Sequence, residues 1–131
     1  METHLESIGA AFILLALAHV FLPRYCGWKE SLSGLSLLNR QMMKVHTFFI
    51  ALIVLLMGLL CLTAATDLIH TALGRRISLG LGIFWGLRLL VQLFGYSTRL
   101  WRGKTKETLV HVGLTIAWAY LTIVFLWVAS R

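Results

Sequence analysis

Three of the five histidines in this 131-residue chain are candidates for holding a cofactor. His19, His46 and His111 each lie near one end of an apolar segment. Imidazoles from facing helices are ligands of haem b, and three imidazoles suit zinc, copper or iron. The sequence therefore suggests haem b or a transition metal, with electron transfer as the role. The alternative is that these histidines lie at a membrane interface and hydrogen-bond to neighbours or lipid headgroups.

A second group of residues places polar chemistry inside an apolar segment. Arg88 lies within such a segment, and Gln92 follows four residues later on the same helix face. An arginine inside a membrane costs about 3 kcal/mol or more unless it is paired, hydrated or close to the interface. We expect four side chains to bind an anionic group, either a haem propionate or an anionic solute: Arg88, Gln92, Tyr96 and Arg40. The alternative is that Arg88 reaches lipid phosphate or forms a structural ion pair with Glu30 or Glu107.

Small residues recur on the segment that carries Arg88. Ser78, Gly82 and Gly86 are spaced by four residues. Small residues at this spacing let a neighbouring helix approach closely in a membrane. We therefore expect one face of this helix to pack against a neighbour and a different face to be polar.

Four apolar segments must position these groups, over residues 5–22, 47–66, 77–94 and 109–128. Each is close to the ~20 residues that cover a ~30 Å hydrocarbon core. Backbone groups in lipid must be satisfied within the segment, so the segments are predicted to be α-helices. The sequence predicts an all-α integral membrane four-helix bundle with up-down-up-down topology, forming a single domain over residues 1–131. We expect Pro23 to end the first helix. We also expect a short interfacial helix before the second, from the helical spacing of Trp28, Leu32 and Leu35.

The composition supports a membrane location. The chain is 59% hydrophobic and only 13% charged, too few charges for the surface of a soluble domain of this size. The net charge is +7, but most basic residues lie between apolar segments, which argues against nucleic acid as a partner. The first and third connections hold eight basic residues: Arg24, Lys29, Arg40, Lys44, Arg99, Arg102, Lys104 and Lys106. The positive-inside rule then predicts that both termini lie outside, and we expect the membrane to be a bacterial-type inner or plasma membrane.

Three functions fit these patterns. The first is a small redox or metal protein that uses the histidines and Arg88. The second is a non-enzymatic accessory or assembly subunit of a larger membrane complex, suggested by the small size and the small-residue face. The third is an oligomeric anion channel or transporter in which Arg88 and Gln92 line a path. The lipid bilayer is the expected partner in each case, with a homo-oligomer or a larger complex as the expected assembly, and the sequence leaves enzymatic activity open.

Overall fold

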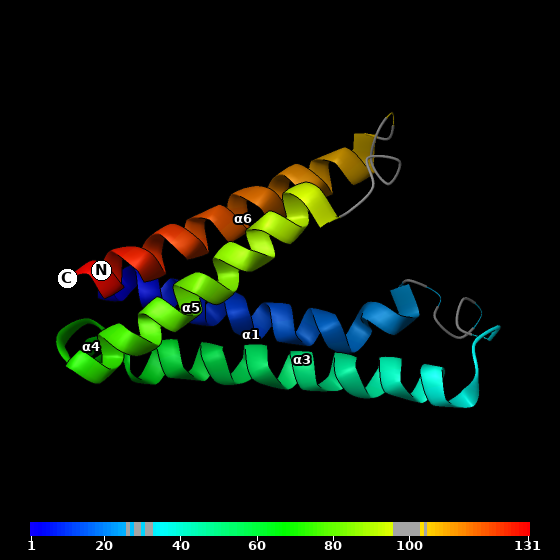
Figure 1. Cartoon of the computed structure of the whole chain (residues 1–131), viewed down its shortest axis with the longest axis horizontal. Coiled ribbons are helices and arrows are strands. Elements are labelled where there is room, and N and C mark those ends of the chain that lie inside the picture. Colours follow the sequence, from blue (N-terminus) through cyan, green and yellow to red (C-terminus); the bar gives the residue numbers. More distant parts are fainter. Residues whose placement is uncertain (26, 28–29, 31–32, 96–102, 104) are drawn as a thin grey trace. The chain divides into compact units, whose positions relative to one another are not determined.

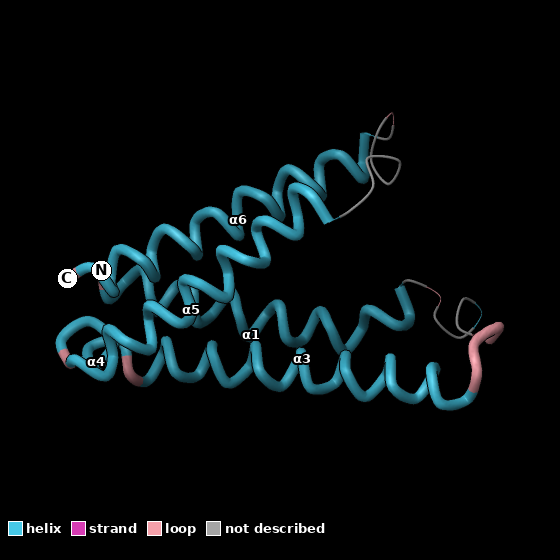
Figure 2. Tube along the Cα trace, viewed as in Figure 1, coloured by secondary structure: helices cyan, strands magenta, loops and turns pink. Residues whose placement is uncertain are grey.

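The computed structural model describes residues 1–25, 27, 30, 33–95, 103 and 105–131. Nearly all of these residues are helical, and none of them forms a strand (Figure 2). The helical elements, in chain order, are α1 (Glu2–Tyr25), α3 (Leu37–Thr63), α4 (Ala65–His70), α5 (Ala72–Leu90), a turn of π-helix η1 (Val91–Gly95) and α6 (Thr105–Ser130). The all-α prediction is therefore confirmed for the described part of the chain.

Four of the helices are long and apolar enough to cross a membrane: α1, α3, α5 together with η1, and α6. They correspond to the four apolar segments of the sequence, and each begins before its segment, but α3 ends at Thr63, three residues before the predicted end at residue 66. The largest extension is in α3, which begins at Leu37 rather than at residue 47. Ser36 caps this helix, because its Oγ accepts a hydrogen bond from the Asn39 backbone N–H at 3.2 Å. Arg40 and Lys44 therefore lie on a helix and not in a loop.

The first helix does not end at Pro23, so that prediction is wrong by two residues. Helix α1 continues to Tyr25. The fixed φ of proline is itself compatible with a helix, but proline removes one backbone hydrogen bond, and the helix ends two residues later. The interfacial helix stays a prediction, because Trp28 and Leu32 lie outside the described residues.

The chain forms two compact units, Glu2–Ala65 and Thr66–Arg131. In the first, α1 and α3 pack along each other as an antiparallel hairpin; in the second, α5 and α6 do the same (Figure 1). The arrangement of all four helices as one up-down-up-down bundle, and the single domain over 1–131, stay predictions.

The α1–α3 hairpin is built on direct contact between two backbones. A Cβ atom added at Gly58 would lie 2.8 Å from the Gly9 carbonyl oxygen, and one added at Gly9 would lie 2.8 Å from the Gly58 carbonyl oxygen. Real Cβ atoms essentially never come this close to a backbone oxygen. Glycine at both positions thus lets the two helices approach more closely than any other residue would.

The α5–α6 hairpin also uses small residues, but against side chains. A Cβ added at Gly82 would lie 2.6 Å from Cδ2 of Leu126, and one added at Gly86 would lie 3.5 Å from Cγ2 of Thr122. Ser78, one turn before Gly82, is fully buried. The small residues predicted to form a packing face therefore lie where α5 meets α6.

A sharp corner precedes α5. Thr71 caps the helix, because its Oγ1 accepts a hydrogen bond from the Gly74 backbone N–H at 2.8 Å and donates one to the Asp67 carbonyl at 2.7 Å. A Cβ at Gly74 would collide with the backbone of Asp67 and Leu68. This close approach explains glycine at a position where a helix would otherwise favour alanine.

Candidate functional site

A network of polar side chains links α5, η1 and α6, with Gln92 at its centre. Gln92 Oε1 accepts hydrogen bonds from Arg88 Nη1 at 3.3 Å and from Trp118 Nε1 at 3.4 Å. The shortest bond of the network joins Gln92 Nε2 to His111 Nδ1 at 2.8 Å. One amide thus connects a cation, an indole and an imidazole across two helices that are otherwise strongly apolar.

The backbone changes its form where Gln92 lies. The α-helical hydrogen bonding of α5 gives way at Val91 to the π-helical turn η1, of which Gln92 is the second residue. Such wide turns are rare, and they occur frequently at functional sites because they alter the direction of the side chains they carry. Gln92 is only 4% exposed here, so the turn holds a polar amide in a buried position that faces α6.

The hydrogen bonds fix the proton on His111. Arginine and tryptophan side chains only donate, so the group of Gln92 that faces both must be its carbonyl oxygen. The NH₂ group of Gln92 then faces His111 and donates to Nδ1. A neutral imidazole that accepts at Nδ1 carries its proton on Nε2. In this arrangement Nε2 of His111 carries the proton and lacks the lone pair that a metal or haem iron would need.

The guanidinium of Arg88 also contacts an aromatic face. Its Cζ lies 5.3 Å from the ring centroid of Trp118, within the range of a cation–π interaction. Trp118 in turn stacks on Trp85, with centroids 5.0 Å apart and an interplanar angle of 18°. Both indoles are buried, at 6% and 3% exposure. The two stacked indoles therefore cover one side of the Arg88 guanidinium.

These contacts offset much of the cost of a charge at this depth. A hydrogen bond to a charged group contributes about 1.5–3 kcal/mol and a desolvated cation–π contact about 2 kcal/mol. Their sum is comparable to the ~3 kcal/mol that an intramembrane arginine costs at the low end of its range. Gln92 and Trp118 are both neutral, however, so neither contact cancels the positive charge of Arg88. These two contacts position the guanidinium without cancelling its charge.

The polar and the small residues of α5 do not occupy separate faces, in contrast to the expectation from the sequence. Gly82 meets Leu126 of α6, while Gln92 bonds His111 and Trp118 of the same helix. At about 100° per residue the ten positions from Gly82 to Gln92 leave the two side chains only about 80° apart. A single neighbouring helix covers both.

Comparison with known proteins adds no assignment. No protein-family model, curated protein or solved structure matches this chain. The site must therefore be interpreted from its own geometry.

The structure regroups the residues predicted from sequence. Arg88, Gln92 and His111 come together in one network, although the sequence assigned His111 to a cofactor with the other histidines. Sequence reasoning missed Trp118 as a member of the site. Its position seven residues after His111, on the same helix face, was the available signal.

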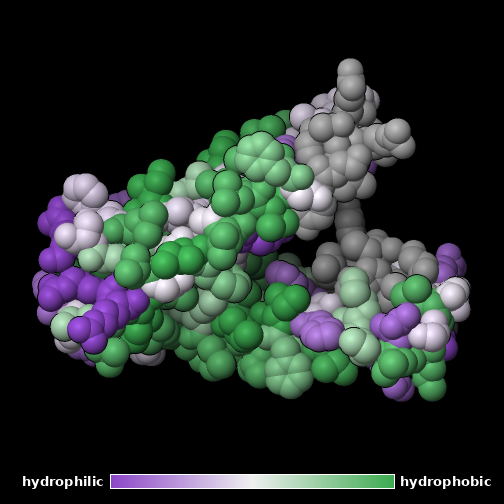
Figure 3. All heavy atoms as spheres, viewed as in Figure 1, coloured by the Kyte–Doolittle hydropathy of each residue, from purple (hydrophilic) through white to green (hydrophobic). Residues whose placement is uncertain are grey.

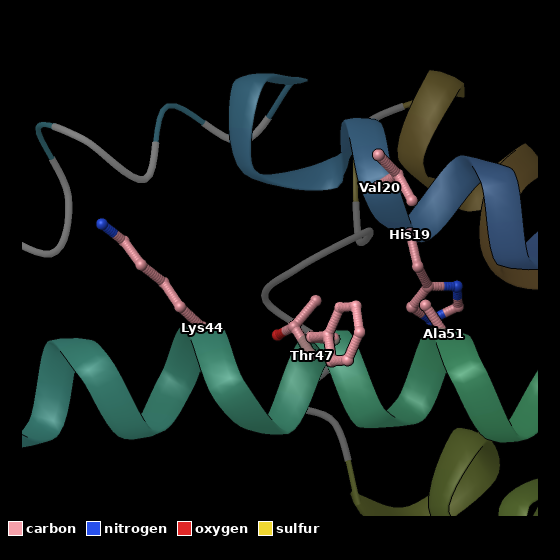
Figure 4. Close-up of a pocket in the computed structure, with 6 residues that line it drawn as sticks. His19, Val20, Lys44, Thr47 and Ala51 are labelled. Atoms are coloured by element: carbon pink, nitrogen blue, oxygen red, sulfur yellow. The ribbon is translucent and has the colours of Figure 1, made fainter.

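His19 lies at a different place, beside a cavity of about 200 Å³ in the α1–α3 hairpin. Its ring extends from α1 towards α3 beside Ala51 (Figure 4). The His19 Nδ1 lies 2.8 Å from the Leu15 carbonyl oxygen. A carbonyl only accepts, so Nδ1 carries the proton and, in the neutral ring, Nε2 has the lone pair. His19 and His111 thus hold opposite tautomers.

The remaining predicted residues do not join either group. His46 is exposed and is not among the residues that line the cavity beside His19. Arg40 belongs to α3, and its Nε is buried without a hydrogen-bond partner among the described residues. Tyr96 lies outside the described residues. The described part of the chain contains no group of three or more His, Cys, Asp or Glu side chains able to hold a metal, and the haem or metal site at His19, His46 and His111 stays a prediction.

Proposed function

We propose that this chain is a small integral membrane protein that binds an anionic solute at Arg88, in the class of anion channels and transporters. The observation that carries the proposal is the network in which Gln92 and Trp118 position the Arg88 guanidinium. The carboxylates and phosphates that arginine binds through paired N–H groups are the expected ligand groups.

The membrane location is supported by the outward faces of the long helices. Large apolar side chains on each of them are more than half exposed, including Leu14, Phe48, Leu87 and Ile116. Figure 3 shows apolar residues spread over much of the visible surface. Apolar patches of this extent are rare on soluble monomers, and lipid is the environment that suits them.

The depth of Arg88 argues for a functional role. Arg88 lies seven residues before Gly95, the end of its candidate span, which corresponds to about 10 Å along the helix axis. His111, which is linked to Arg88 through Gln92, lies six residues after Thr105, the start of α6, at a similar depth of about 9 Å. Ionisable residues at such positions typically mark the path of a substrate or an ion.

The roles of the four residues follow from their chemistry. Arg88 supplies the positive charge, and Gln92 fixes the orientation of the guanidinium plane. Trp118 covers one face of the guanidinium. The same amide orients the imidazole of His111. The N–H groups of a fixed guanidinium favour an oxyanion over a cation.

Binding is tested first, with the fluorescence of Trp118 and Trp85 as the signal, in detergent-solubilised full-length protein. Chloride is replaced stepwise by acetate or by phosphate at constant ionic strength. We expect a saturable change that is absent in Arg88→Gln and weakened in Arg88→Lys, which keeps the charge but not the planar pair of donors. Arg76→Gln removes an exposed charge from the same helix and serves as the control.

Gln92→Glu separates anion binding from a purely structural role of Arg88. A carboxylate at this position would pair with Arg88 and cancel its charge, so the protein should remain folded but lose the anion-dependent signal. The same variants in liposomes then show whether a bound anion is also transported. Wild-type protein that is folded and gives no anion-dependent signal would refute the proposal and leave the accessory-subunit hypothesis.

The haem or metal hypothesis is tested on the same sample by an absorption spectrum, oxidised and reduced. A Soret band lost in His111→Ala would show that Gln92 does not hold this imidazole as described, and it would contradict our proposal. A Soret band lost in His19→Ala alone would place a cofactor in the other hairpin and leave the Arg88 network untouched.

A further inference from the structure

The cavity of the α1–α3 hairpin lies where the apolar part of α3 begins. It is lined by His19 and Val20 of α1 and by Lys44, Thr47, Phe48 and Ala51 of α3. Lys44 is the last charged residue of α3, because residues 45–66 contain no Lys, Arg, Asp or Glu. In a membrane this is the level of the lipid headgroups.

The cavity combines two polar groups of opposite hydrogen-bonding character. Lys44 supplies an ammonium group, which only donates. His19 supplies the lone pair of Nε2, since its Nδ1 proton is used by the Leu15 carbonyl. Figure 4 shows His19 reaching from α1 towards α3 beside Ala51, whereas Lys44 extends from α3 with its ammonium group directed away from His19, so the two groups lie at opposite sides of the site. A ligand that satisfies both must carry a negative oxygen and a hydroxyl donor.

A second cationic side chain lies one turn from Lys44 on the same face of α3. Arg40 precedes Lys44 by four residues, and its buried Nε has no hydrogen-bond partner among the described residues. A buried donor without a partner costs about 1–3 kcal/mol. A negative group bound near Lys44 would offset this cost.

The size of the cavity limits its occupant. Its volume of about 200 Å³ is several times the ~30 Å³ share of a water molecule but below the ~300 Å³ of the smallest pockets for drug-sized ligands. Haem is too large for it. The walls at Val20, Phe48 and Ala51 are apolar and suit the start of an acyl chain.

We propose that this cavity binds the headgroup of an anionic phospholipid with hydroxyl groups next to its phosphate, as in phosphatidylglycerol. The phosphate lies at Lys44, a headgroup hydroxyl donates to His19 Nε2, and the acyl chains follow Val20 and Phe48. The inference rests on the proposed membrane crossing but not on the anion site at Arg88, which is in the other hairpin.

The test uses the delipidated full-length protein in detergent and native mass spectrometry with short-chain phosphatidylglycerol or phosphatidylcholine. We expect one phosphatidylglycerol per chain, bound about tenfold more tightly than phosphatidylcholine, since a charge-assisted hydrogen bond contributes about that factor or more. Lys44→Gln should remove the preference. His19→Phe, which keeps a ring but loses the lone pair, should weaken phosphatidylglycerol alone. Arg76→Gln, an equal loss of charge outside the cavity, should change nothing.

Two further measurements keep the result interpretable. Ala51→Phe fills the cavity without removing charge and should block the bound lipid, which covers the case in which Lys44→Gln fails to fold. Glycerol phosphate added in excess should not displace the lipid; displacement would assign the site to a soluble phosphate compound and overturn the lipid proposal. Equal binding of both lipids, or unchanged binding in Ala51→Phe and Lys44→Gln, would overturn it as well.

Discussion

Threonines of both hairpins bond carbonyls of their own helix, Thr115 and Thr122 in α6 included, but the α5–α6 hairpin adds bonds between its helices. In α1–α3, the side chains of His19, Thr47 and Thr63 each bond a carbonyl of their own helix. In α5–α6, Gln92 bonds side chains on a second helix. The first hairpin therefore relies on close packing of its backbones at Gly9 and Gly58, and the second adds a buried amide network that both helices must complete.

The two kinds of bonding constrain the helices differently. Bonds within one helix satisfy the polar groups and leave the partner helix free to shift along it. A network shared between helices fixes their relative position, because moving either helix breaks several bonds together. A site that holds a cation in one orientation needs helices with a fixed relative position. Arg88 lies in the hairpin whose helices share such a network.

The largest effect is expected from Gly58→Ala. The added methyl group would lie 2.8 Å from the Gly9 carbonyl oxygen, which belongs to the backbone and cannot rotate away. The helices must separate and lose their contacts, and we expect a loss of about 3 kcal/mol in the free energy of unfolding, the upper end of the usual cost of an overpacked core. Thermal unfolding in detergent measures it.

Gly80→Ala is the matched control, because nothing lies within 4 Å of its added Cβ. It should be neutral or stabilising by up to about 1 kcal/mol from helix propensity. Equal effects of the two substitutions would remove backbone contact as the basis of the α1–α3 hairpin.

A smaller loss is expected from Gln92→Leu. Leucine keeps the volume but removes the acceptor of Arg88 and Trp118 and the donor to His111. We expect about 2 kcal/mol or more of destabilisation, the typical cost of removing one partner from buried polar groups. Gln41→Leu makes the same change at an exposed position of α3 and should cost little. If the two variants unfold alike, the network does not hold α5 to α6.

The sequence predicts some features of the fold and of the candidate site but not others. The four apolar helices follow from segment length alone, because lipid demands internal backbone bonding. The polar stripe of Arg88 and Gln92 follows from helical spacing. The pairing of Gln92 with His111 does not, because it depends on which helix is the neighbour and on the π-helical turn at Val91–Gly95.

Two other features lay beyond sequence reasoning for related reasons. The contact of Gly9 with Gly58 joins residues far apart in the chain, and nothing in the spacing of either helix identifies the other. The tautomers of His19 and His111 are set by single neighbours, a carbonyl in one case and an amide in the other. The sequence analysis assigned both histidines to one cofactor site because each lies near the end of an apolar segment. Which ring nitrogen carries the proton depends instead on the hydrogen-bond partner of each ring.

Trp118→Phe is expected to have a moderate effect. Phenylalanine keeps an aromatic surface against Trp85 but removes the Nε1–H that donates to Gln92. The bond is long at 3.4 Å, so we expect a loss of about 1 kcal/mol, the net contribution of an ordinary hydrogen bond. Trp127→Phe, at a half-exposed indole of the same helix, is the control. No difference between the two would show that Trp118 acts by its ring alone.

The smallest effect is expected from Thr63→Val in the α1–α3 hairpin. The Thr63 hydroxyl donates to the Leu59 carbonyl at 2.7 Å, and valine has nearly the same shape. That carbonyl is four residues back on the same helix, where it also accepts the backbone N–H of the helical ladder, so the substitution leaves no group unsatisfied. We expect a change within about 0.5 kcal/mol. A loss as large as that of Trp118→Phe would mean that bonds within one helix stabilise α1–α3 as much as the shared network stabilises α5–α6, and the contrast between the two hairpins would then rest on packing alone.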